Sequence, residues 1–339
     1  MPDSRRPVNS RLPRDAAGSL DLHGGTGGIT AMCSCGEFLE VYKEGVTFRV
    51  RCPESIDPGR TNPNAPFVAA VADSVGSSSP VVARVLLQGR DILEMAVFER
   101  QVDKAAVVQL LHASKESLVV CEKVAKRVAS HVDSIINEIR AHGLKRDSRG
   151  RTVYPFPQAP ELEANATAFL VNAKRAIQSI CRLPSLFLSV EPKDTNFDAL
   201  VKTLSKAAGT SSPVTKFVRS NAAAVRYLID LRNFQEHPGA KRTIVDNFAV
   251  MPDGSVAVPM WYVSGETPRP IRDEMLAAVG FLVQIAEAML IHLVMGAVSK
   301  QIPFVMEEID DTHVNPKTPI RYRLSIDIKR LKTDAQASN

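Results

Sequence analysis

The chain has 339 residues, of which 45% are apolar and 23% carry a formal charge. This balance is ordinary for a soluble globular protein and excludes a chain that is disordered throughout. The net charge of +5 is compatible with an anionic partner such as RNA but does not by itself establish one. The five cysteines are an odd number with no secretory signal ahead of them, so we expect a reducing, cytoplasmic setting.

The N-terminal part of the chain is predicted to contain a tail and a small β segment. Residues 1–30 are rich in Arg, Pro and Gly and lack apolar periodicity, so we predict a disordered tail. Residues 31–78 are predicted to form a small β-containing segment. Within it, apolar and polar residues alternate over 37–42 and 46–51, which indicates a β-hairpin, and a loop rich in Pro and Asn follows.

Cysteine spacing in this segment raises the question of a zinc site. His23, Cys33, Cys35 and Cys52 offer the right ligand types. Structural zinc usually shows paired C-x-x-C motifs, whereas here a C-x-C is followed by one distant cysteine. The spacing therefore favours free or semi-buried thiols. The chain also has no phosphate-binding glycine loop, nucleophile elbow or H-E-x-x-H motif, so we expect no metal and no cofactor.

The remainder of the chain, 79–330, is predicted to form a helical bundle. The segment 102–143 lacks internal Pro and Gly and has apolar residues at three- and four-residue steps, which predicts one helix roughly 60 Å long. We therefore predict a mainly α fold, a helical bundle with one long helix. The predicted β additions are a hairpin at the Pro-Asp-Gly-Ser turn, 252–255, and a strand within 318–328. One further helix is predicted to start near Pro80. Four others are predicted to span about 160–182, 194–208, 213–236 and 271–299.

The segment 275–298 is apolar and long enough to cross a membrane. However, Gln284, Glu287 and His292 lie near its middle, and each of these side chains is expensive to place in lipid. We therefore predict a central helix buried by the bundle, with no membrane partner. Glu287 and His292 would then need partners inside the protein.

The end of the predicted 213–236 helix carries the main functional signal. It places Arg232, Asn233, Glu236 and His237 within its last turns, immediately before Pro238. The sequence R-N-F-Q-E-H resembles the motif of the HEPN family, the higher eukaryotes and prokaryotes nucleotide-binding domains. Members of that family are α-helical bundles with an Arg, four to six residues and then a His, often with a polar residue directly after the Arg. The resemblance implies a HEPN-like core at about 160–300.

This resemblance implies metal-independent cleavage of RNA at a site composed across a homodimer. Arg232 and His237 would be the catalytic residues, and Asn233 and Glu236 would bind or orient the substrate. The chemistry suits the side chains, because imidazole can accept or donate a proton near neutral pH and guanidinium offers a planar fork of donors to a phosphate. The resemblance also implies a role in stress or phage defence, with an antitoxin or another regulatory protein as a candidate partner.

Helix geometry complicates this interpretation. Residues five apart on a continuous helix point about 140° away from each other, so Arg232 and His237 would not converge. Either Pro238 disrupts the helix at His237 and lets the imidazole swing, or two chains face each other across a dyad. The dimer needs less distortion and is preferred. The alternative functions are a non-catalytic helical RNA-binding protein or a protein-interaction scaffold that uses the 102–143 helix. A third possibility is an ordinary helix end, in which Arg232 and His237 cap helix carbonyls or pair with Asp230 and Glu236 without any catalysis.

Overall fold

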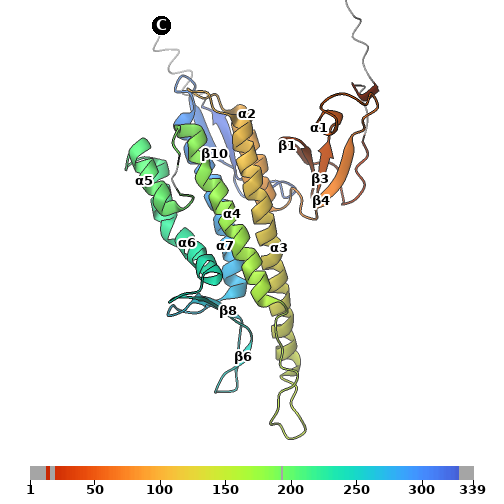
Figure 1. Cartoon of the computed structure of the whole chain (residues 1–339), viewed down its shortest axis with the longest axis vertical. Helices are drawn as coiled ribbons and strands as arrows, with labels where there is room; N and C mark the ends of the chain where they lie inside the picture. Colours follow the sequence, from red (N-terminus) through yellow and green to blue (C-terminus); the bar gives the residue numbers. More distant parts are fainter. Residues whose placement is uncertain (1–12, 16–19, 192–193, 328–339) are drawn as a thin grey trace, which may run out of the picture.

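The computed structural model describes residues 13–15, 20–191 and 194–327. Long helices lie side by side, and small sheets lie at their ends and along one flank (Figure 1). The chain is 49% helical and 16% strand, with the strands in four small sheets. The predicted mainly α class is therefore wrong, and the protein is a mixed α/β protein. Most of the predicted tail, 1–12 and 16–19, lies outside the described residues.

The predicted long helix is present as α3, Lys104–His142. Its start is fixed by Asp103, whose side chain accepts a hydrogen bond from the Ala106 backbone N–H at 2.9 Å. It ends at Gly143, where φ is +68°, a conformation that glycine adopts without a side-chain clash. The segment that begins at Pro80 is helical as predicted, although its first part, η2, is a π-helical stretch, Val81–Leu87, that continues into α2, Gln88–Met95.

The other long helices follow the predicted order. Helix α4 extends past its predicted end, through Pro184, because that proline is buried among apolar neighbours and its packing offsets the missing backbone hydrogen bond. Helix α4 packs along α3, and α5 packs on α6 (Figure 1). The bounds are α4 Leu162–Leu188, α5 Phe197–Ala207, α6 Pro213–Glu236 and α7 Ile271–Ala297.

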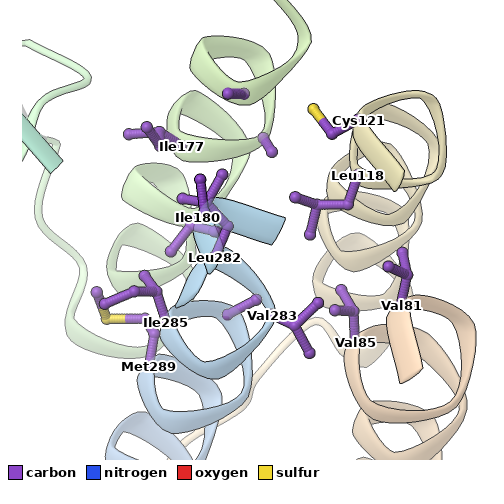
Figure 2. Close-up of a cluster of buried hydrophobic side chains, with 14 of the residues drawn as sticks. Val81, Val85, Leu118, Cys121, Ile177, Ile180, Leu282, Val283, Ile285 and Met289 are labelled. Atoms are coloured by element: carbon purple, nitrogen blue, oxygen red, sulfur yellow. The ribbon is translucent and has the colours of Figure 1, made fainter. Parts of the chain in front are cut away.

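Helix α7 forms the centre of the core. Its side chains meet residues of α3, α4 and η2, including Leu118, Ile180 and Val85 (Figure 2). Among the described residues α7 is the one helix that is long and apolar enough to cross a membrane, and 61% of its most apolar window is buried inside the protein. Its Glu287 carboxylate forms an ion pair with Arg84 on η2, which supplies the internal partner that the sequence requires.

Four antiparallel strands form the N-terminal sheet in the order β1-β2-β3-β4. The predicted hairpin is confirmed as β2 and β3, whereas β1 and β4 were not predicted. Strand β4 is mostly Ala and Val and is largely exposed, so it lacks the alternation that marks a half-buried strand. The bounds are β1 Ala31–Ser34, β2 Leu39–Lys43, β3 Val46–Arg51 and β4 Val68–Asp73, and the short helix α1, Pro53–Ile56, lies between β3 and β4.

The two faces of this sheet have different roles. One face carries Val41, Phe48 and Val50, which form a small apolar core of their own. The opposite face is directed at α3, where the sheet is joined to the helix by polar contacts, such as a 2.8 Å bond from Lys123 to Asp73. The N-terminal sheet lies beside the first half of α3 in Figure 1.

The remaining strands explain why the mainly α prediction failed. Each is two to five residues long, too short for a clear periodic signal. The hairpin at Pro-Asp-Gly-Ser is confirmed as β6–β7, and the last predicted strand as β11, which pairs with an unpredicted β10. The bounds are β5 Thr243–Asp246, β6 Ala249–Val250, β7 Val256–Ala257, β8 Met260–Val263, β9 Arg269–Pro270, β10 Phe304–Glu308 and β11 Tyr322–Ile326.

Candidate functional site

The predicted site lies at the C-terminal end of α6. Ser212 caps the start of this helix by accepting a hydrogen bond from the Thr215 N–H at 3.3 Å. The helix ends at Glu236, and His237 has left helical geometry with φ −127° and ψ 68°. The ring of Pro238 disfavours helical dihedrals at the residue before it, which accounts for this position of the helix end.

Because His237 leaves the helix, its side chain and that of Arg232 approach the same carboxylate oxygen of Glu236. Arg232 Nη2 forms an ion pair with Glu236 Oε2. His237 Nε2 lies 4.0 Å from the same oxygen. Within one chain, the guanidinium and the imidazole therefore flank a single anionic oxygen instead of pointing away from each other.

A second helix adds a cation to this group. Lys174 on α4 donates to Asn233 Oδ1 at 3.1 Å, and Arg232 Nη1 is 3.4 Å from the same oxygen. Burial is the main cause that lowers the pKa of Lys174 from its ordinary value, and the positive charge of Arg232 lowers it further. Sequence reasoning missed Lys174, because it is 59 residues from Asn233 and no local spacing links the two.

The members of this group differ in their access to solvent. The side chain of His237 is 78% exposed, whereas those of Glu236 and Arg232 are 31% and 20% exposed. The Arg232 Nε atom is buried and has no hydrogen-bond partner among the described residues. The imidazole is therefore open to an incoming ligand, while the guanidinium is held against the helix by Glu236 and Asn233. We refer to Lys174, Arg232, Asn233, Glu236 and His237 as the α6-end cluster.

An open pocket borders this cluster. It has a volume of about 990 Å³, and Asn233 contributes to its wall. Helix α5 supplies Lys202 and Lys206 to the lining, and an ion pair between Arg226 and Asp198 spans from α6 to α5. The lining also carries the carboxylates Glu191, Asp194, Asp198 and Asp230, so the groove beside the α6-end cluster presents charges of both signs.

A second polar group, which sequence reasoning did not find, lies between the N-terminal sheet and α3. Its centre is Glu40, a fully buried carboxylate. Glu40 accepts hydrogen bonds from Lys115 Nζ at 2.7 Å, from Arg49 Nε at 3.0 Å and from Tyr42 Oη, and His112 Nε2 is 3.0 Å from it. We refer to these five residues as the Glu40 cluster.

The charges in this cluster favour ionised Glu40. Burial alone opposes ionisation, but the His112 hydrogen bond and the charge of Lys115 outweigh it and hold the pKa of the Glu40 carboxyl below its usual range. Two thiols, Cys33 and Cys35, lie next to the cluster. The pKa of Cys33 is lowered mainly by a hydrogen bond from the Cys35 thiol and, to a smaller extent, by the positive charge of Arg90.

The zinc set considered from the sequence is only partly brought together. Cys33 and Cys35 are neighbours and buried, whereas His23 is exposed and Cys52 is half-buried at the start of α1. The histidine that approaches the Cys35 thiol is His112.

No family model, curated protein or solved structure matches the chain. Function is therefore inferred from the chemistry of the side chains in these two clusters.

Proposed function

We propose that this protein is a metal-independent endoribonuclease of the HEPN type, with Arg232 and His237 as its catalytic residues. One observation carries the proposal: Glu236 Oε2 is approached by both Arg232 and His237. A carboxylate oxygen and a phosphate oxygen are both anionic acceptors, so the position of Glu236 marks where a scissile phosphate would be bound. Glu236 is partly exposed and can rotate away when a polyanion enters.

The side chains supply the chemistry that such cleavage needs. A base removes the proton of the ribose 2′-hydroxyl, the oxygen attacks the adjacent phosphorus, and the bond to the 5′-oxygen breaks after that oxygen receives a proton. The products are a 2′,3′-cyclic phosphate and a free 5′-hydroxyl. His237 performs one of the two proton transfers, and Arg232 stabilises the charge that develops on the phosphate oxygens.

A homodimer would complete the site. A single imidazole performs one proton transfer at a time, so the second transfer needs another group close to the phosphate. A second chain related by a two-fold axis would bring its own histidine to the same groove, and the exposed side chain of His237 leaves room for this approach. The substrate is RNA, and the setting proposed is the cytoplasm.

The test uses end-labelled RNA incubated with the purified chain in the presence of EDTA. We expect cleavage with cyclic phosphate ends, reduced about 100-fold or more in His237→Ala and in Arg232→Ala. His142→Ala is the matched control, because His142 is likewise an exposed histidine at the C-terminal end of a long helix. Wild type that is as inactive as the variants, or cleavage that both variants retain, would overturn the proposal.

Mixing the His237→Ala variant with wild type tests the dimer separately. If each groove needs the histidines of both chains, a mixed dimer is inactive because one of its two imidazoles is missing. Random exchange of subunits in an equal mixture would then halve the activity of the wild-type chains. Undiminished activity, with exchange verified by mass spectrometry, would show that one chain is sufficient for cleavage.

A further inference from the structure

The strand residues of the Glu40 cluster and the two neighbouring thiols lie on one face of the N-terminal sheet, opposite His112 and Lys115 of α3. Cys33 on β1 is opposite Glu40 on β2, which in turn is opposite Arg49 on β3. Directly paired residues of antiparallel strands project to the same face, with Cβ atoms about 5 Å apart. Cys35 is two residues beyond Cys33 and is buried on the same side.

The chain turns sharply after Cys35. Gly36 adopts φ +77°, which favours glycine, and the Cys35 N–H donates to the Phe38 carbonyl at 2.9 Å. This tight turn holds the Cys35 thiol at the edge of the sheet, against α3. There it meets His112, whose ring packs edge-on to Phe38 at a centroid distance of 5.6 Å.

We propose that Cys33, Cys35, Glu40 and His112 form a binding site for a thiophilic divalent cation, with zinc as the natural candidate. The donor atoms of Cys35, Glu40 and His112 all lie within 4.8 Å of one another. Tetrahedral zinc with bonds of 2.0–2.3 Å holds its donors roughly 3.3–3.8 Å apart, so closure of these three ligands needs movements of about 1 Å. The Cys33 thiol, which contacts the Ser34 carbonyl at 3.8 Å, lies outside this group and would turn toward it to supply the fourth ligand. Thiolate, imidazole and carboxylate are the ligand types that zinc accepts in proteins.

The charge balance of the region permits such an ion. Glu40 and Glu116 are matched by Lys115 and Arg49, with Lys115 Nζ 2.7 Å from Glu116 as well. Binding of a divalent cation releases one proton from each thiol to solvent, so two positive charges enter as two positive charges leave. The buried region therefore gains no net charge when the ion binds.

The surroundings also resemble the support that metal ligands usually have. Tyr42 and Lys115 both donate to Glu40 Oε2, which leaves Oε1 as the oxygen directed at His112 and Arg49. Such hydrogen bonds fix the orientation of a ligating carboxylate. In the metal-bound form His112 would carry its proton on Nδ1 and direct its Nε2 lone pair at the ion, in place of donating from Nε2 to this oxygen.

A disulfide between the two cysteines is a weaker use of the same residues. Residues i and i+2 of an extended strand have Cα atoms roughly 6.6 Å apart, close to the upper limit for a disulfide. The buried thiols also face a carboxylate and an imidazole, groups that a disulfide would not use. A bridging ion joins the sheet to α3, whereas a disulfide would join Cys33 only to the residue two positions further along the chain.

The experiment titrates the EDTA-stripped full-length chain with Zn²⁺ in competition with a chromophoric chelator, and with Co²⁺ to detect thiolate-to-metal absorption. We expect one ion per chain, release of two protons and thiolate–Co²⁺ bands. Cys35→Ser and His112→Ala should each weaken binding by about 100-fold or more. Cys52→Ser is the matched control and should bind like wild type, because Cys52 lies outside the cluster.

Circular dichroism establishes that each variant is folded, and Cys33→Ser serves as a second thiol variant if Cys35→Ser unfolds. Absence of Zn²⁺ binding by the folded wild type, or equal binding by the Cys35 and Cys52 variants, would overturn the proposal. Loss of both free thiols to a Cys33–Cys35 disulfide in the isolated protein would also overturn it. None of these readouts involves RNA, so their failure is separate from failure of the ribonuclease proposal.

Discussion

The Glu40 cluster and the α6-end cluster are built from similar parts. Each has a glutamate at its centre, and each glutamate is approached by an arginine and a histidine: Arg49 and His112 in one case, Arg232 and His237 in the other. Each also includes a lysine from a neighbouring helix. The side-chain types alone therefore do not distinguish the two groups.

Their burial does distinguish them. The side chain of Glu40 is fully buried and that of His112 is 14% exposed, whereas the values for Glu236 and His237 are 31% and 78%. A charge pair held away from water cannot be exchanged for another partner without a large desolvation penalty. A pair at the surface is weak and exchangeable. The buried cluster is thus suited to joining structural elements, and the exposed one to binding an incoming anion.

Substitution of the two glutamates gives the largest expected difference. Glu40→Gln leaves Lys115 in a buried site with only Glu116 as a charged partner. We expect it to lower the free energy of unfolding by about 3 kcal/mol, the low end for breaking a buried ion pair, because Glu116 remains. Glu236→Gln should lower it by less than about 1 kcal/mol. Urea unfolding of EDTA-treated protein measures both, and equal losses would show that burial does not separate the clusters.

Removal of one hydroxyl group tests the same contrast on a smaller scale. Tyr42 is fully buried and donates to Glu40, so Tyr42→Phe removes a hydrogen bond to a charged acceptor. The expected loss of unfolding free energy is about 2 kcal/mol. The control is Tyr262→Phe, since Tyr262 donates to Asp246 at 3.0 Å in a solvent-exposed pair. A Tyr42→Phe variant as stable as the Tyr262→Phe variant would contradict the role assigned to the buried network.

The same contrast determines what could be predicted from sequence. Arg232, Asn233, Glu236 and His237 lie within six consecutive residues, so a helix and its proline stop are enough to bring them together. The residues of the Glu40 cluster come from two strands and from α3. Their approach depends on how the sheet packs on the helix, which no local pattern encodes. This is why sequence analysis considered His23 together with Cys33 and Cys35 and favoured free thiols, although the histidine close to Cys35 is His112.

The same distinction between local and long-range signals applies to the secondary-structure elements. The long helices were predicted close to their observed bounds, apart from the end of α4, because each repeats an apolar stripe over many turns. Gly143 and Pro238 also mark where α3 and α6 end. The strands β1, β4 and β10 were missed, since they are four to six residues long and their sequences do not alternate between apolar and polar residues. Their omission is what made the chain look mainly α.

Glu236 offers a third test, which depends on the proposed ribonuclease function. Because its carboxylate occupies the anion position between Arg232 and His237, it competes with phosphate. An exposed ion pair is worth at most about 1 kcal/mol, so Glu236→Gln should tighten binding of a non-cleavable 2′-O-methyl RNA up to about five-fold. Fluorescence anisotropy at fixed salt measures the change. Weaker binding by the variant would mean that Glu236 holds the substrate instead of competing with it.

The smallest expected effect comes from a histidine outside both clusters. His292 on α7 packs against the ring of Phe217 at 5.1 Å and lines a cavity with Arg84, Glu287 and Arg321, and also with Tyr322. Arg84 and Glu287 pair with each other, so neither is committed to the imidazole. Burial lowers the pKa of His292 from its ordinary value of 6.5. It thus represents an intermediate case, a half-buried histidine with no carboxylate assigned to it.

The sign of its contribution follows from proton linkage. Below pH 6.5 the unfolded chain binds a proton at His292 that the folded chain resists, so stability falls as the pH decreases through 6.5 until the folded-state pKa is also passed. His292→Phe keeps an aromatic ring against Phe217 and should remove this part of the pH dependence, a change in melting temperature of at most about 2 °C between pH 7 and pH 5. His142→Phe, at an exposed position, should leave the slope unchanged. An identical slope in wild type and His292→Phe would show that the imidazole protonates in the folded protein as readily as in the unfolded chain.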